Sequence, residues 1–94
     1  MAPKSSKPTL PASFTLAGFE WTVKIVPDLS EYGRCDISVQ TIFVRDGMNE
    51  QMTQQTFFHE LVHAIMFTMG HTTHDEVFTD AFGAFLHQFE KTKL

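Results

Sequence analysis

The chain has 94 residues and a formal charge of −4; 43% of its residues are hydrophobic, and ten are phenylalanine. That length suits one domain, and this apolar content excludes a disordered tail. An acidic balance without a lysine or arginine cluster argues against nucleic-acid binding, and no apolar run approaches the roughly 20 residues that span a bilayer.

Residues 1–13, MAPKSSKPTLPAS, are predicted to form a flexible leader ahead of a domain at residues 14–94. Three of the four prolines fall in this stretch, together with serines and lysines. The leader has no apolar segment of the kind that a secretory signal needs. The single Cys35 cannot form an intramolecular disulfide. We therefore expect a protein of the reducing cytoplasm.

Two segments after the leader have the pattern of strands. In FEWTVKIVPD, residues 19–28, apolar and polar side chains alternate until Pro27-Asp28. RCDISVQTIFVRDG, residues 34–47, is rich in isoleucine, valine and threonine, and it is interpreted as two short strands that meet near residues 38–41. Asp46-Gly47 is a turn signal that ends this region.

The remaining residues have a helical period. In residues 49–70, apolar side chains recur at positions 58, 61, 62, 65 and 69, with Asn49 as the predicted N-cap and Gly70 as the predicted stop. After the loop HTTHD, Thr73 or Asp75 would cap a second helix with apolar Val77, Phe78, Ala81, Phe82, Phe85, Leu86 and Phe89. The expected fold class is α+β: a small antiparallel or mixed sheet of two to three strands, followed by two helices. We expect core packing, rather than a dimer patch, to use Phe57, Phe67, Phe78 and Phe89.

The first helix carries the sequence HELVH at residues 59–63. Residues four apart lie on one face of a helix, so His59 and His63 can bind one ion, and zinc accepts imidazole nitrogens readily. Glu60 projects to the side of the pair, from which it can reach a water bound to the metal. The pattern H-E-x-x-H therefore predicts two zinc ligands and a general base.

A catalytic zinc needs a third protein ligand. The residues after His63 that can supply it are His71, His74, Asp75, Glu76 and Asp80. An antiparallel second helix would bring Glu76 back to the histidine pair and complete a His₂Glu set, which favours this residue. His71 or His74, in the loop, is the alternative third ligand.

The second helix has a polar or small face formed by Glu76, Asp80, Gly83 and His87. Asp80 is predicted to accept a hydrogen bond from the free N–H of a ligating histidine. Gly83 lowers helix stability relative to alanine, which favours a close approach to the first helix. Exposure to solvent is the alternative interpretation of Asp80 and His87.

TFFHELVHAIMFTMG followed by DEVFTDAFGAFLHQF resembles the small gluzincin-type zinc metallopeptidase domains often encoded by phages and prophages, which are relatives of the ImmA/IrrE-type peptidases. The resemblance covers about residues 19–90. It implies zinc ligation by His59, His63 and Glu76, with Glu60 as the general base. It also implies a sheet edge that can bind an extended peptide, and a host-cell cytoplasmic location if a phage encodes the chain.

The expected function is zinc-dependent hydrolysis of a peptide or protein substrate. Zinc lowers the pKa of its bound water and polarises the scissile carbonyl, while Glu60 takes the proton of the water. Tyr32, His71 and His74 are the candidates for a second donor to the oxyanion, and a loop histidine is favoured. The substrate strand is expected to add to the sheet through residues 42–45. A non-catalytic, zinc-stabilised protein-binding module is the alternative function.

Overall fold

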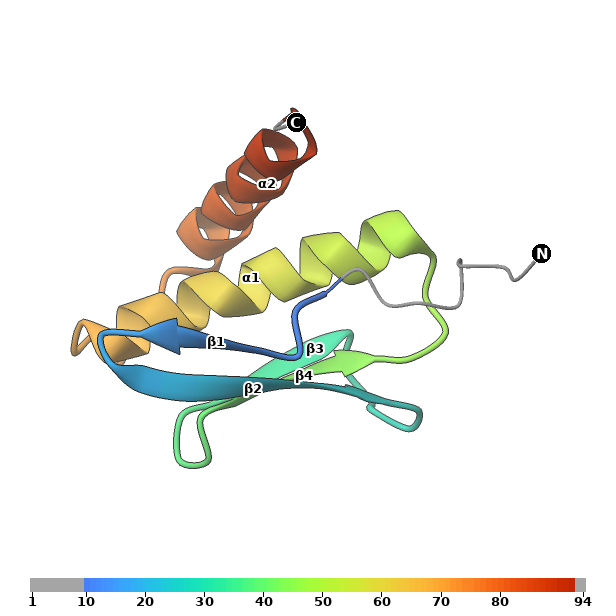
Figure 1. Cartoon of the computed structure of the whole chain (residues 1–94). Helices are drawn as coiled ribbons and strands as arrows, with labels where there is room; N and C mark the ends of the chain where they lie inside the picture. The colour runs from blue at the N-terminus through green and yellow to red at the C-terminus, as the bar shows by residue number, and fades with distance from the viewer. Residues whose placement is uncertain (1–9, 93–94) are drawn as a thin grey trace.

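The computed structural model describes residues 10–92, which form a sheet followed by two helices (Figure 1). The elements in chain order are β1 (Ser13–Leu16), β2 (Phe19–Val26), β3 (Gly33–Asp36), β4 (Thr41–Arg45), α1 (Glu50–Thr68) and α2 (Glu76–Thr92). Helix α1 lies along one face of the sheet, and α2 crosses α1 on the side away from the sheet. This arrangement confirms the predicted α+β class.

The described residues form a four-stranded mixed sheet in the order β1-β2-β4-β3, with one strand more than predicted. Strands β1 and β2 make an antiparallel hairpin, in which Leu16 pairs with Phe19 across the two-residue turn Ala17-Gly18. Both turn residues have positive φ, 49° and 85°, as a type I′ turn requires. Strand β1 was missed because alanine is not a signal for this turn.

The predicted leader, residues 1–13, overlaps the described part of the chain at residues 10–13. Residues 1–9 of the predicted leader lie outside the described residues. Leu10 packs against the core, the carbonyl of Ala12 accepts a hydrogen bond from the Val23 N–H, and Ser13 begins β1. The described end of the leader is therefore part of the folded unit.

Strand β4 is internal, because it pairs in parallel with β2 and antiparallel with β3. Its Ile42 and Val44 side chains are fully buried. The prediction that a substrate strand adds through residues 42–45 is therefore wrong: both ladders of this strand are already occupied. The two edge strands of the described sheet are β1 and β3.

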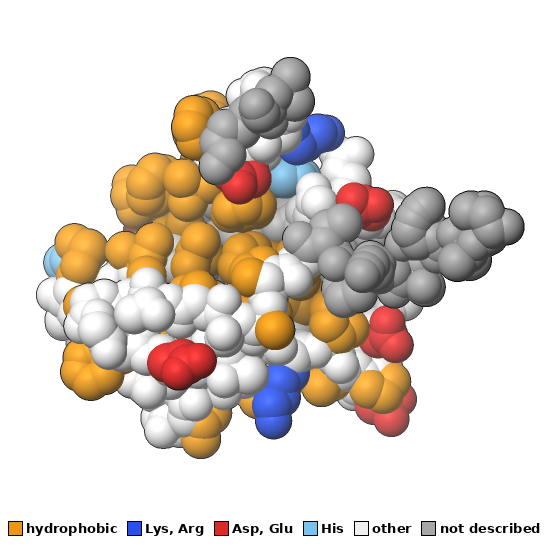
Figure 2. All heavy atoms as spheres, viewed as in Figure 1, with side chains coloured by type: hydrophobic (Ala, Val, Ile, Leu, Met, Phe, Trp, Pro, Cys, Tyr) orange, Lys and Arg blue, Asp and Glu red, His pale blue; other side chains and the backbone are white. Residues whose placement is uncertain are grey.

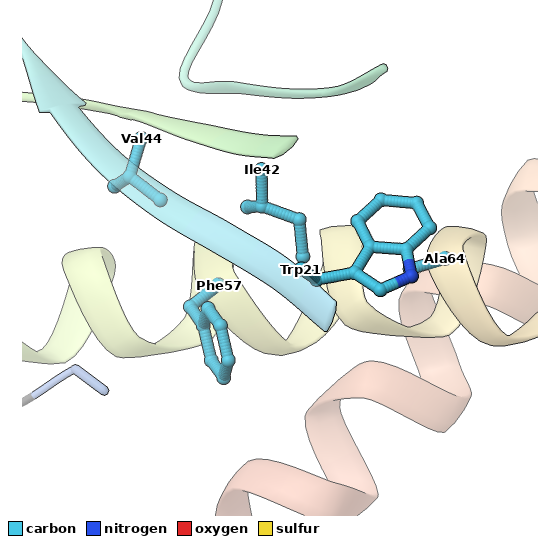
Figure 3. Packing of buried hydrophobic residues seen from close by; sticks show 5 residues of the cluster. All are labelled: Trp21, Ile42, Val44, Phe57 and Ala64. Carbon is cyan, nitrogen blue, oxygen red and sulfur yellow. The ribbon is translucent and has the colours of Figure 1, made fainter. Parts of the chain in front are cut away.

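The core lies between the sheet and α1 and consists of Trp21, Ile42, Val44, Phe57 and Ala64 (Figure 3). The alternation predicted for β2 places Trp21 on this inner face. Phe14 of β1 stacks on Trp21 with ring centroids 6.1 Å apart and meets Phe57 edge-on at the same distance. The aromatic contacts thus hold the hairpin against α1.

Helix α1 begins and ends where the sequence predicts. The Asn49 side chain accepts a hydrogen bond from the Met52 N–H at 2.8 Å, which caps the first turn. At the other end Gly70 has φ 96°, and the N–H groups of Gly70 and His71 donate to the carbonyls of Phe67 and Met66. This is a Schellman motif, and it turns the chain back toward α2.

Helix α2 turns its polar and small face, not its phenylalanines, toward α1. Its buried residues are Thr79, Gly83 and His87. Phe78 and Phe89 are 51% and 62% exposed, so their predicted use in the core is wrong. The reason is the close contact between the helices: a Cβ on Gly83 would lie 3.0 Å from the His59 backbone, a separation that leaves no room for a phenylalanine.

Neither described helix is both long enough and apolar enough to cross a membrane.

Candidate metal centre

His59 and His63 lie one turn apart on the side of α1 that faces α2. Their ring centroids are 5.1 Å apart, and their side chains are 23% and 13% exposed. On the opposite side of α1, Phe57 and Ala64 pack into the core, and this packing fixes the rotation of the helix about its axis. Burial of the apolar face therefore aims both imidazoles at the interhelical cleft.

Glu76 completes a cluster with the two histidines. Its Oε1 lies 3.3 Å from His59 Nε2, and its Oε2 lies 3.3 Å from His63 Nε2. Among the described residues, these three are the only group whose candidate ligand atoms lie together, all within 4.8 Å of one another. Asp75 caps the helix that Glu76 opens, because its Oδ1 accepts the N–H of Val77 at 3.0 Å, whereas the Glu76 side chain itself is 68% exposed.

The three side chains lie close enough to approach one shared ion. Ligand atoms that are about 2.0–2.1 Å from a tetrahedral ion lie about 3.3 Å from one another. The two 3.3 Å separations reach different oxygens of the Glu76 carboxylate, and the candidate ligand atoms of the three residues all lie within 4.8 Å of one another. Small side-chain adjustments would therefore bring both Nε2 atoms and one carboxylate oxygen around a single ion.

The second nitrogen of each histidine has its own partner. His59 Nδ1 lies 3.3 Å from Asp80 Oδ1, the contact that the sequence predicted for Asp80, while 74% of the Asp80 side chain is exposed to solvent, which was the alternative. His63 Nδ1 contacts Nδ1 of His74, whose Nε2–H donates to the His71 carbonyl at 3.0 Å. Since His74 carries its proton on Nε2, its Nδ1 accepts the His63 Nδ1–H. Both partners thus leave the Nε2 lone pairs of His59 and His63 directed at Glu76.

The loop histidines, predicted as alternative third ligands, do not join the cluster. The His74 ring stacks on His63 at 4.8 Å and meets Phe67 in a tilted contact at 4.4 Å, so His74 supports His63 from behind. The His71 side chain is exposed, and its carbonyl holds His74. Sequence patterns had no means of assigning this supporting role to His74, because the loop conformation decides it.

Glu60 is buried beside the cluster, with 8% of its surface exposed. Burial raises the pKa of its carboxyl to about 7, the nearby His59 lowers it, and Glu76 and Glu31 raise it further. A Cβ on Gly33 would lie 3.0 Å from Glu60 Cγ and 3.2 Å from Oε2, so β3 closes over this carboxyl. The role of Gly33 was not predicted from the sequence, because only the packing of β3 on α1 shows that a side chain at this position would collide with Glu60.

An open cleft of about 430 Å³ connects these groups and is lined by Gly33, Arg34, Cys35, His59, Glu60, His63, Phe67, Thr72, His74 and Glu76. The cluster and the Glu60 carboxyl share this cleft, and β3 forms one wall. Tyr32 lines an adjoining cavity of about 340 Å³, next to Glu60 and Asp80.

The shifted pKa values of Cys35 and His63 favour the neutral form of each side chain. Burial, with Glu60 and Asp36 adding to it, raises the pKa of the Cys35 thiol to about 12, so the thiol stays protonated at neutral pH. Burial is also the largest influence on His63 and lowers its pKa. A neutral imidazole is the form that binds a metal ion.

His87, for which solvent exposure was the alternative, is 4% exposed and lies in the helix interface. Its ring stacks on Phe58 at 5.7 Å, and its nitrogens lie 2.8 Å from Gln55 Oε1 and 3.0 Å from Gln54 Oε1. Burial lowers its pKa, and the neutral ring donates through one of its two nitrogens to the amide oxygen that faces it. His87 thus fixes the far end of the same helix pair.

Comparisons of the chain with models of known protein families, with curated proteins and with solved structures find no match. The resemblance to the ImmA/IrrE-type peptidases therefore depends on the sequence motifs alone.

Proposed function

We propose that this protein is a zinc-dependent peptidase. The observation that carries the proposal is the convergence of His59, His63 and Glu76 in a cleft that also holds the buried Glu60 carboxyl. These three residues would hold the ion through two Nε2 atoms and one carboxylate oxygen. When bound, zinc supplies Lewis acidity toward a peptide carbonyl and toward water.

Glu60 is the residue placed to move the proton. It lies one position after His59 and is not one of the three converging ligands, so it is free to act as a general base. In this proposal Glu60 takes a proton from the attacking water and passes it to the leaving amine. Gly33 leaves room for this carboxyl beneath β3.

An extended peptide is the substrate that the cleft favours. Strand β3 ends the sheet, and its Gly33 and Cys35 line the cleft. A peptide paired with β3 would run past the cluster and would gain main-chain hydrogen bonds. Both ring nitrogens of His74 are engaged, so Tyr32 and His71 are the candidates for the second oxyanion donor.

One observation favours a second function, a zinc-stabilised protein-binding module. The cluster takes two residues from α1 and one from α2, so an ion there would also clamp the helices together. Such a module would bind zinc without turnover. In either function the Cys35 thiol suits the reducing cytoplasm as the place of action.

The first test is the zinc content of the purified wild-type chain and two variants. We expect one zinc per chain in wild type and in Glu50→Ala, and a sharp loss in Glu76→Ala. Glu50 is the matched control because it is also the first residue of a capped helix. Full zinc content in Glu76→Ala would move the third ligand to His71 or His74. Absence of zinc from wild type, even after reconstitution, would refute the proposal.

Turnover is tested with a peptide library and mass spectrometry of the products. We expect zinc-loaded wild type to cleave and Glu60→Gln to retain zinc without cleaving. Cleavage by Glu60→Gln at the wild-type rate would exclude Glu60 as the base. Zinc binding without cleavage by either protein would favour the binding module.

A further inference from the structure

Helix α2 has an exposed phenylalanine face, formed by Phe78, Phe82, Phe85 and Phe89. These side chains are 51%, 40%, 67% and 62% exposed. Their spacing of four, three and four residues places them on one side of the helix, away from the side that packs on α1. Figure 2 shows hydrophobic side chains gathered over α2 and the adjoining part of α1.

The phenylalanine face carries no charge. Its neighbours along the helix are Val77, Ala81 and Gln88, which are small or neutral. Asp80 and His87, the ionisable residues between Val77 and Phe89, are both directed at α1, where they contact His59 and the two glutamines. Another helix can therefore approach this face without burying a charge, which would be costly.

We propose that two copies of the chain associate through this face, with their α2 helices antiparallel. The spacing of the four rings is the same in both directions along the helix, so Phe78 of one copy meets Phe89 of the other and Phe82 meets Phe85. A face that matches itself when reversed is what a twofold interface requires. The pairing leaves the metal cluster accessible, because Glu76 and Asp80 lie toward α1.

The available area suffices for a stable dimer. The exposed fractions of the four rings, applied to roughly 200 Å² for a phenylalanine, correspond to about 450 Å² per chain. Val77, which is 79% exposed, and the neighbouring residues add to this area. Two copies would together bury roughly 1,200 Å², which is at the lower end of specific interfaces.

The charges at the ends of α2 select the antiparallel arrangement. Asp75, Glu76 and Asp80 make the start of the helix acidic, whereas Glu90 and Lys91 near its end carry opposite charges. A parallel pair would place the two acidic ends side by side. An antiparallel pair instead places each acidic start beside the Glu90-Lys91 end of the other copy, where the two charges cancel, and it also opposes the helix dipoles.

A second copy fits this face better than a lipid surface does. Helices that lie on membranes combine an apolar face with lysine and arginine, which contact anionic headgroups. Here the chain has a net charge of −4, and α2 has three acidic residues against one lysine within its described length. We therefore assign the face to self-association.

The first experiment is sedimentation equilibrium at chain concentrations of about 1–100 μM. We expect a wild-type dimer, and we expect Phe85→Glu to weaken dimerisation at least about 100-fold without changing the circular dichroism spectrum. The matched control is Phe19→Glu, since Phe19 is 57% exposed on β2 and should leave the dimer intact. A monomeric wild type, or a dimer that Phe85→Glu does not weaken, would overturn the proposal. Binding of monomeric wild type to neutral phosphatidylcholine vesicles would assign the face to lipid instead.

The second experiment tests the orientation by disulfide crosslinking in a Cys35→Ser background. A mixture of Phe78→Cys chains and Phe89→Cys chains should crosslink, whereas Phe89→Cys chains alone should not. Efficient crosslinking of Phe89→Cys alone would show a parallel pair and overturn the antiparallel arrangement. Neither experiment depends on zinc or on hydrolysis, so the outcome is independent of the proposed function.

Discussion

Replacing Gly83 with alanine would perturb the point at which α2 comes closest to α1. The new Cβ would lie 3.0 Å from both the Cα and the N of His59 and 3.2 Å from the carbonyl carbon of Phe58. All three are backbone atoms of a helix, so no side chain can rotate out of the way. Because ordinary contacts begin near 3.4 Å, the helices must separate by about 0.5 Å.

Two opposing effects decide the stability of Gly83→Ala. Alanine favours the helix by about 1 kcal/mol relative to glycine. Overpacking of a close contact costs about 1–3 kcal/mol. We therefore expect the metal-free variant to lose up to about 2 kcal/mol of unfolding free energy. Zinc affinity should fall more clearly, by at least about tenfold, because ligand spacing tolerates only about 0.2 Å and Glu76 would move with α2.

Urea denaturation of the metal-free protein measures the first effect, and zinc titration against a competing chelator measures the second. Gln88→Ala is the control, since Gln88 is exposed on the same helix and its replacement should leave zinc affinity unchanged. A Gly83→Ala protein that is about 1 kcal/mol more stable than wild type and binds zinc equally well would refute the packing argument. It would show that the helices adjust freely at this contact.

Two further predictions concern buried side chains of α1. Burial raises the pKa of Glu60 from 4.5 to about 7, so between these pH values the folded state keeps a proton that the unfolded state releases. The free energy of unfolding should therefore fall by about 2–3 kcal/mol as pH rises from 4.5 to 7. Metal-free Glu60→Gln should therefore match wild type near pH 4.5 and exceed it at pH 8 in urea denaturation; equal stability at both pH values would contradict this. Phe57→Ala should cost about 3–5 kcal/mol, because Phe57 is 5% exposed, whereas Phe19→Ala on the surface should cost less than about 1 kcal/mol. Similar thermal shifts for these two variants would contradict the assignment of the core.

Local signals in the sequence predicted most of the secondary structure. The caps at Asn49 and Asp75 and the stop at Gly70 depend on side chains within one turn of the position that they terminate, so a single sequence reveals them. Alternation likewise placed Trp21 on the inner face of β2. Strand β1 escaped because it has only four residues and because Ala17 adopts a positive φ that its side chain does not favour.

Pairing between distant segments was not predictable in the same way. Residues 41–45 have a strand pattern whether they lie at an edge or in the middle of a sheet. Their internal place comes from the parallel pairing with β2, for example Val23 with Ile42, which no local pattern specifies.

The orientation of α2 shows two sequence rules in conflict. The hydrophobic period predicts that the phenylalanines face the core, whereas the small and polar residues predict a close approach to α1 around Gly83. The second rule prevailed, because the interface between the helices is too narrow for phenylalanine. Because the small and polar face of α2 packs on α1, Glu76 and Asp80 lie beside His59. The sequence therefore predicted the members of the candidate site, but it did not predict that the phenylalanines of α2 would be exposed. The support of His63 by His74 depends on a loop conformation and was not predictable.

The layered arrangement of the molecule, in which α2 packs mainly on α1, has a consequence for the rate of metal exchange. A helix held through one interface can detach in a local opening that requires less free energy than unfolding of the whole chain. Such an opening would withdraw Glu76 while His59 and His63 stayed on the helix that is anchored in the core. Release of an ion would then take place in two stages, and the first stage would be timed by the motion of α2. Pairing of α2 with a second copy would slow that motion, so the lifetime of the bound ion would depend on protein concentration.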